Sequence, residues 1–390
     1  MNLLDLLLLL FALAYALSGY RQGFIVGACS TVGLLIGGAV GIWLVPMFLE
    51  GFSPSITVSL VALFGVLLAA SLGQTVAAFG GARVRRQVTW HPARTVDAAG
   101  GALLSSVAAL IVAWALGVAV TGAQIPSINE QLQSSKVLAL VDRTLPGGAN
   151  EVLGALDAII DQGQFPDYLE PFVPEQIIPV DPPTRRVLRD PEVREAANSV
   201  VKVLGTAECG RGVEGSGFLY APERVMTNAH VVAGVDEPDV VLGSSSYSAE
   251  VVLYDPDLDI AVLEVPGIGG TPLDFDRGAE PGDSAAVLGY PGNGPFHAEP
   301  ARIRAQQRLR SPDIYDHGVV HREVFSLYAD VRPGNSGGPL VSADGDVYGV
   351  IFAASISDSD TGYAVTAQQV TQNALRGRSA TDPVDTGECT

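Results

Sequence analysis

The chain has 390 residues, a formal net charge of −19 at pH 7 and a mean hydropathy of +0.30. The charge is uneven, because residues 1–125 hold five arginines against Asp5, Glu50 and Asp97, a net +2, so the rest carries −21. An apolar, slightly basic part joined to a strongly acidic part predicts a membrane anchor followed by a soluble domain. The acidic part excludes nucleic-acid binding, which needs clustered lysines and arginines.

Four apolar runs fill the first part of the chain, at 3–19, 24–49, 55–80 and 99–123. Each is near or above the roughly 20 residues that span a bilayer. Helices buried in a soluble core are the alternative, and the near absence of charge disfavours them. The first run could instead be a signal peptide, but it lacks a basic start and a small-residue cleavage site. We therefore expect a four-helix transmembrane domain over 1–124.

Basic residues predict how this domain is oriented in the membrane. The loop after the first run holds Arg21, the loop after the third holds four arginines, and the loop after the second holds none. The positive-inside rule places the first and third loops in the cytoplasm. Both termini, and everything after residue 125, should then lie outside a multi-pass cell (inner) membrane anchor. The small residues of "GACSTVGLLIGGAVG" predict close helix packing.

The stretch "DLLLLLFALAYALSGYRQGFIVGACSTVGLLIGGAVG" resembles the opening of the colicin V production family of small membrane proteins. The resemblance extends over roughly residues 1–120. It implies a helical membrane domain and no particular chemistry.

Residues 125–198 predict an extracytoplasmic linker. The pattern "VLGALDAIIDQ" has helical spacing. It is followed by "FPDYLEPFVPEQIIPVDPPTRR", whose prolines exclude a continuous helix. We expect a short helix and then an extended tether, which is a suitable site for proteolysis.

From Ser199 to the end, the pattern changes to short β-branched runs separated by glycines, such as "RVMTNAHVV", "DIAVLEV" and "VYGVIFA". Strand-like runs at spacings of about ten residues predict an all-β barrel or sandwich. We therefore expect a separate β domain over 199–390.

Three polar residues stand out within this β domain. His230 lies in "TNAHVV", Asp259 in "DLDIAVLEV" and Ser336 in "GNSGGP". Each alone is compatible with a structural role or a turn. Together they supply a nucleophile, a base and a carboxylate that orients the base, in a chain order that recurs for acyl transfer. Asp257 is the rival of Asp259 for the orienting role.

The blocks "GSGFLYAPERVMTNAHVV", "DLDIAVLEV" and "DVRPGNSGGPL" resemble the signature blocks of chymotrypsin-like serine proteases, with the bacterial high-temperature-requirement branch nearest. The resemblance implies a double six-stranded β-barrel and a serine endopeptidase without metal or cofactor. It assigns His230 as general base and acid, Asp259 as orienter and Ser336 as nucleophile. The family places the aspartate directly before the Ile-Ala-Val run, which favours Asp259. Backbone N–H groups of Gly334 and Ser336 would form the oxyanion hole.

The whole architecture resembles the membrane-bound acid-resistance serine proteases of actinobacteria. This implies protein substrates in the cell envelope and a role in acid and oxidative stress. Cleavage of its own linker is a further hypothesis. A binding or chaperone-like outer domain with an idle triad, and a transport component with a regulatory outer domain, are the alternatives.

Asp330 lies six residues before Ser336, where the resemblance places the floor of the substrate pocket. A carboxylate there would favour substrates with Arg or Lys. The alternative is that Asp330 caps backbone amides in a reshaped loop. The strand "GVIFAAS" is expected to pair with the substrate backbone by strand addition.

The chain has three cysteines. Cys29 lies within a predicted span, whereas Cys209 and Cys389 lie in the outer domain. An oxidising compartment favours a disulfide between these two, the alternative being two free thiols. Its long loop would stabilise the fold by roughly 3–5 kcal/mol in the chain-entropy model.

His317 and His321, with Asp313 and Asp316, have a loose metal-binding spacing. They occur in a polar segment before Ser336. We expect a surface loop there rather than a metal site.

Overall fold

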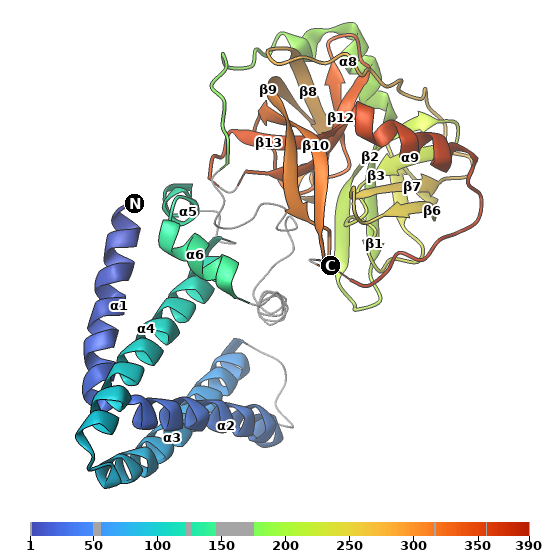
Figure 1. Cartoon of the computed structure of the whole chain (residues 1–390). Coiled ribbons are helices and arrows are strands. Elements are labelled where there is room, and N and C mark those ends of the chain that lie inside the picture. Colours follow the sequence, from blue (N-terminus) through green and yellow to red (C-terminus); the bar gives the residue numbers. More distant parts are fainter. Residues whose placement is uncertain are drawn as a thin grey trace. The chain divides into compact units, whose positions relative to one another are not determined.

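The computed structural model divides into two compact units (Figure 1). The first comprises Met1–Gly117 and Ser135–Leu145, and the second comprises Val118–Ser134 and Pro146–Thr390. The residues that the structure describes are 2–49, 56–121, 126–145, 175–315, 317–355 and 357–389. The predicted linker helix in "VLGALDAIIDQ" and the first part of the tether lie outside the described residues.

The first unit is helical. Its helices are α1 (Leu3–Gln22), α2 (Phe24–Leu49), α3 (Ile56–Gln87), α4 (His91–Thr121) and α6 (Lys136–Thr144). In the described part of the chain, three segments are long and apolar enough to cross a membrane: Leu3–Gln22, Phe24–Gly41 and His91–Val118. The described part of the remaining predicted run, 56–80, falls within α3, a 32-residue helix whose last turn contains Arg85 and Arg86.

Small residues bring these helices together. Gly33 of α2 lies directly against Gly73 and Ala77 of α3. Gly19 of α1 lies against Gly101 of α4 in the same way. A β-carbon at either glycine would collide with the neighbouring backbone. The close packing predicted from the small residues is therefore present.

The few acidic side chains of this unit join helix ends. The Asp97 carboxylate accepts hydrogen bonds from the N–H of Ile25 at 2.9 Å and from Nε of Arg85 at 2.6 Å. The Asp5 carboxylate accepts one from Ser135 Oγ at 2.7 Å, at the residue that caps α6. Each buried carboxylate thus has the partners that burial of a charge requires.

The second unit contains α5 (Pro126–Gln133) and the β domain. The strands of its first sheet are β1 (Val200–Thr206), β2 (Gly212–Ala221), β3 (Arg224–Thr227), β4 (Asp239–Leu242), β5 (Ser245–Ser248), β6 (Glu250–Asp255) and β7 (Ile260–Glu264). Those of the second are β8 (Ser284–Gly289), β9 (His297–Pro312), β10 (Val319–Tyr328), β11 (Pro339–Ser342), β12 (Val347–Ala354) and β13 (Thr361–Thr366). A 3₁₀ turn, η3 (Pro291–Asn293), joins β8 to β9.

The two sheets form a two-barrel-like β domain of the chymotrypsin-like fold, in which the second sheet closes and the first does not (Figure 1). The second sheet closes as a six-stranded barrel in the order β10-β13-β12-β11-β8-β9. The first differs from the expected six-stranded barrel, since it is an open seven-stranded sheet in the order β5-β4-β1-β2-β3-β7-β6. The β4–β5 hairpin pairs with β1 and extends the sheet on that side.

A shared hydrophobic core fixes the two sheets against each other. Phe218 and Met226 of the first sheet and Val350 and Phe352 of the second are fully buried in one cluster. Burial of each such side chain contributes about 1.5–3 kcal/mol. The cluster also contains Val187, so the packed domain begins before residue 199. That residue belongs to η1 (Val187–Arg189), which leads into α8 (Pro191–Ala196) and η2 (Ala197–Ser199).

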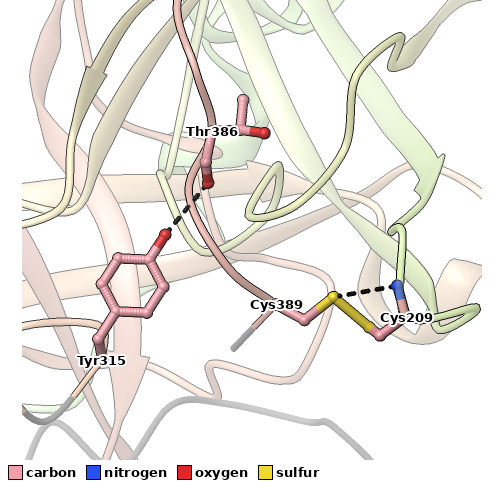
Figure 2. The surroundings of a disulfide bond; sticks show 4 residues. All are labelled: Cys209, Tyr315, Thr386 and Cys389. Carbon is pink, nitrogen blue, oxygen red and sulfur yellow. Dashed lines mark hydrogen bonds between the residues drawn. A yellow bond between two sulfur atoms is a disulfide. The ribbon is translucent and has the colours of Figure 1, made fainter.

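The C-terminal helix α9 (Ala367–Ser379) packs against strands of both sheets. The tail beyond it then follows the first sheet. Thr386 O accepts hydrogen bonds from the N–H of Gly234 at 3.2 Å and from the hydroxyl of Tyr315 at 3.1 Å. Figure 2 shows the tail ending at the disulfide between Cys389 and Cys209. The pairing predicted from the sequence is thus present.

Candidate active site

His230 and Asp259 meet because the strands next to them are neighbours. His230 follows β3 and Asp259 directly precedes β7, and these two strands pair antiparallel. The Asp259 carboxylate accepts a hydrogen bond from the backbone N–H of His230 at 2.9 Å, and its other oxygen lies 2.8 Å from His230 Nδ1. Asp259 is fully buried, whereas the His230 ring is 11% exposed. Nδ1 of the ring is thus engaged by the Asp259 carboxylate.

Asp259 adopts a backbone conformation that few residues other than glycine tolerate. Its φ angle is +59°. Its carbonyl accepts a hydrogen bond from Asn228 Nδ2 at 2.7 Å, which holds the turn in place. Asp257, the rival for this position, is exposed. The structure therefore brings Asp259, and not Asp257, to His230.

Ser336 lies on the turn that precedes β11. Its carbonyl accepts a hydrogen bond from the N–H of Ser216 at 2.8 Å. The next residue, Gly337, packs directly against Thr227 and Asn228, close to His230 in the chain. Ser336 is 2% exposed, and its Oγ has no hydrogen-bond partner among the described residues. A buried hydroxyl without a partner among the described residues remains available for reaction, since catalytic hydrogen bonds often tighten only when substrate binds.

Gly334 can be only glycine at its position. Its φ angle is +88°, and a β-carbon there would lie 2.5 Å from Tyr290 O and 2.8 Å from Gly292 N. Its carbonyl accepts a hydrogen bond from Ser216 Oγ at 2.6 Å. Ser216 Oγ in turn accepts a hydrogen bond from the N–H of Tyr290 at 2.9 Å. The peptide groups around Gly334 are thereby fixed in one orientation.

Ser216 is the residue of this site that the sequence did not reveal. It is fully buried and its hydroxyl joins the loop of Gly334 to the residue after β8. The available signal was a polar residue between two glycines in the strand run "GSGFLY". Because its partner Gly334 is 118 positions away, that pattern could not say what the hydroxyl binds.

The N–H groups of Gly334 and Ser336 donate to no backbone carbonyl within the described part of the chain. Two free N–H groups beside a serine hydroxyl can stabilise an oxygen that becomes negatively charged. The geometry therefore suits acyl transfer at Ser336.

A cleft of about 610 Å³ opens beside this loop. Two residues of its lining, Gly292 and Pro333, are bonded to each other, since the N–H of Gly292 donates to Pro333 O at 2.8 Å. Pro333 directly precedes Gly334, so the cleft borders the loop of Gly334. Polar and apolar groups contribute about equally to its walls, and Glu214, Asn293 and Arg332 are the polar side chains. The lining is Leu204, Gly205, Gly212, Val213, Glu214, Pro291, Gly292, Asn293, Arg332 and Pro333.

One wall of the cleft is held by Lys202 of β1. Its Nζ donates to the carbonyl oxygen of Asn293 at 2.9 Å and lies 5.4 Å from the centre of the Tyr290 ring. Burial raises the pKa of the Tyr290 hydroxyl. These contacts fix the 3₁₀ turn that Gly334 packs against.

The remaining candidate residues lie apart from this arrangement. Asp330 has a side chain that is 52% exposed and lies 3.5 Å from Arg332 Nε, and it does not line the cleft. The His317 ring stacks on Tyr315. His321 lies opposite Arg310 on the β9–β10 ladder. Asp316 is outside the described residues.

The closed second barrel, the first sheet packed against it and the pairing of Asp259 with His230 are features of chymotrypsin-like serine proteases. The model of the trypsin-like peptidase domain matches residues 215–350, and that of the colicin V production protein matches residues 4–146. The chain is 39% identical to the serine protease Rv3671c of Mycobacterium tuberculosis, over 99% of this chain and 98% of that protein. It therefore belongs to the same family of membrane-anchored serine proteases.

One solved structure agrees with this assignment. The crystal structure of the active form of the Rv3671c protease matches with a TM-score of 0.54 and 46% identity, covering 57% of this chain and 98% of that chain.

A further relative is similar in sequence over part of the chain. The magnetosome formation protease MamE of Paramagnetospirillum magneticum is 31% identical over 46% of this chain, and the match covers 24% of that protein. The likeness to MamE thus concerns only part of either protein.

Proposed function

We propose that the chain is a serine endopeptidase in which Ser336 is the nucleophile, His230 the general base and acid, and Asp259 the residue that orients His230. The single observation that supports this assignment is the pairing of His230 with the buried carboxylate of Asp259. Gly334 and Ser336 supply the N–H groups of the oxyanion hole.

In this mechanism, Ser336 Oγ attacks the carbonyl carbon of the scissile peptide bond while His230 takes the hydroxyl proton. The carbonyl oxygen becomes negative and is stabilised by the two N–H groups. His230 then gives its proton to the leaving amine, and the C–N bond breaks. Water, deprotonated by the same histidine, releases the acyl group and regenerates Ser336. Asp259 stabilises the imidazolium that forms in each half-reaction.

The substrate would extend on both sides of Ser336. The cleft beside Gly334 suits the residues that follow the scissile bond, and the end of β12 suits strand addition by the residues that precede it. A preference for Arg or Lys through Asp330 would require Arg332 to release that carboxylate. We therefore expect no strong preference for basic residues.

We infer that the membrane domain, over 1–124, has four spans and that the linker (125–198) and protease domain (199–390) are extracytoplasmic. The arginines in the first and third loops, the three long apolar helices and α3, which covers the remaining predicted run, support this topology. Fusion of alkaline phosphatase after residue 52 and after residue 390 should give active enzyme. Fusion after residue 88 should not. Alkaline phosphatase activity in the fusion after residue 88 would mean that the membrane domain has the opposite orientation.

The physiological role that we propose is cleavage of cell-envelope proteins during acid and oxidative stress. The family, the disulfide and the acidity of the outer part support it. A strain that lacks the chain should lose viability at low pH and recover with the wild-type sequence. Recovery with Ser336→Ala as well would mean that the role does not depend on proteolysis.

Self-cleavage of the linker is part of the same proposal, since the Pro-rich tether is a suitable protease substrate. Mass spectrometry of the purified wild type should find a new N-terminus between about residues 165 and 198. Its presence in the Ser336→Ala variant as well would assign the cut to another protease.

The decisive test is labelling of the full-length chain by a fluorophosphonate probe. The wild type should be labelled at Ser336, and Ser336→Ala and His230→Ala should not. If the wild type stays unlabelled at neutral and acid pH, the result would favour the alternative that the outer domain is a binding or chaperone-like domain without protease activity.

A further inference from the structure

The segment that leads from the linker into the β domain is attached to the second barrel through Glu175. Its carboxylate accepts a hydrogen bond from the Tyr363 hydroxyl at 2.6 Å and another from Ser357 Oγ at 3.0 Å. Tyr363 belongs to β13 and is only 1% exposed, and Ser357 lies on the turn between β12 and β13. Hydrogen bonds to a charged acceptor are stronger than those between neutral groups.

Arg304 makes a second connection between the same two segments. This buried side chain donates to Ile178 O at 3.1 Å through one terminal nitrogen and to Asp360 O at 3.4 Å through the other. The latter nitrogen also lies 3.6 Å from the Asp358 carboxylate. The entry segment and the β12–β13 turn are thus held by one guanidinium.

The β12–β13 turn also contacts the segment that precedes Ser336, at Ala329 and Val331. The N–H of Ala329 donates to Asp360 O at 3.0 Å. Gly362, directly after the turn, packs on the side chain of Val331. The backbone around residues 329–331 therefore takes its position from the turn, and Ser336 follows it within a few residues.

The other end of the turn reaches the substrate side of Ser336. The N–H of Gly337 donates to Ile351 O at 2.8 Å, so the end of β12 emerges beside the nucleophile. The N–H of Ser355 then donates to Thr361 O at 2.8 Å and closes the turn. A peptide that adds to the end of β12 would lie against this turn.

We propose that Glu175 is a positioning residue for substrate binding, which acts through the β12–β13 turn and makes the end of the linker part of the protease. This inference rests on the proposed function of Ser336. It assigns opposite consequences to linker cleavage on the two sides of Glu175. A cut before Glu175 keeps the turn attached, whereas a cut after Ile178 removes its anchor.

The test uses the full-length chain in detergent and peptide substrates that extend at least four residues before the scissile bond. Glu175→Ala should raise KM by about tenfold with kcat changed less than about twofold, because it removes a charged acceptor from two hydroxyls that order the turn. Glu175→Gln, which keeps one acceptor oxygen, should show a smaller rise. Tyr363→Phe should raise KM similarly, and its effect should not add to that of Glu175→Ala.

Asp181→Asn is the matched control, since it removes an exposed carboxylate from the same segment and should behave like the wild type. An unchanged KM in Glu175→Ala would overturn the inference. So would a loss of kcat in proportion to a lower unfolding temperature, because that pattern indicates a merely structural role. If the wild type neither turns over peptide nor reacts with the fluorophosphonate, the proposed function fails and this inference fails with it.

Discussion

Asp259 holds His230 by two hydrogen bonds, one to the backbone N–H and one to ring Nδ1, while its own φ angle is +59°. Asp and Asn tolerate this left-handed region better than most residues. The two bonds fix both the tautomer and the orientation of the ring. The backbone conformation and the carboxylate of Asp259 together thus orient His230, the proposed general base.

Asp259→Asn should lower kcat by about 10³–10⁴-fold, because an amide at this position favours the wrong tautomer of His230. The side chain keeps its size, so the unfolding temperature should change little. Steady-state kinetics on a peptide substrate measures the effect. Asp257→Asn is the control and should keep full activity, since Asp257 is exposed. The reverse result would transfer the orienting role to Asp257.

Gly334→Ala should lower kcat by about 10²–10³-fold, the loss expected when one oxyanion donor moves. The added carbon would meet Tyr290 O and Gly292 N, and the peptide of the oxyanion hole must shift to avoid them. Gly243→Ala is a matched control, since it has φ +61° but open space around it. The control should lose stability through backbone strain and keep its kcat. Equal losses of kcat in both variants would contradict the assignment of Gly334.

Removal of the disulfide by Cys389→Ser should lower the free energy of unfolding by roughly 3–5 kcal/mol in the chain-entropy model. The bond closes a loop with a sequence separation of 180, and it holds a tail that also binds Gly234 and Tyr315. Urea unfolding of the oxidised chain measures the change. Cys29→Ser should leave the midpoint unaltered, because Cys29 is a free cysteine in α2. A midpoint for Cys389→Ser equal to that of the wild type would show that the tail is held without the bond.

Asp346→Asn should raise the unfolding temperature at pH 7 and have little effect at acid pH. Burial, together with the neighbouring Asp274, Asp276 and Asp344, raises the pKa of the Asp346 carboxyl above its usual value. A folded-state pKa above the unfolded one means that the charged carboxylate costs stability at neutral pH. The cost disappears as the pH falls through the folded-state pKa. The wild type should therefore approach the variant in stability on acidification.

Thermal unfolding at several pH values between 4 and 7 would follow this convergence, with Asp181→Asn as a control that keeps the wild-type profile. A gain in Asp346→Asn that is the same at every pH would contradict the titration argument.

The sequence by itself determined the apolar helices and the strand pattern after Ser199, because each is encoded in a local period. Short motifs also singled out His230, Ser336 and, with its rival Asp257, Asp259. It also predicted the pairing of Cys209 with Cys389. Only the tertiary structure decided between Asp259 and Asp257, since that choice depends on how β3 lies beside β7. It also placed Asp330 at the surface beside Arg332.

Tertiary structure alone showed that Ser216 fixes the loop of Gly334 and that Glu175 anchors the β12–β13 turn. The two pairs are separated by 118 and 182 positions in the chain. A short motif carries no information about such partners, because they come together only when the core of the two sheets brings distant strands into contact. Local motifs therefore predicted the candidate catalytic residues, whereas the packing of the two sheets decided the contacts that position them.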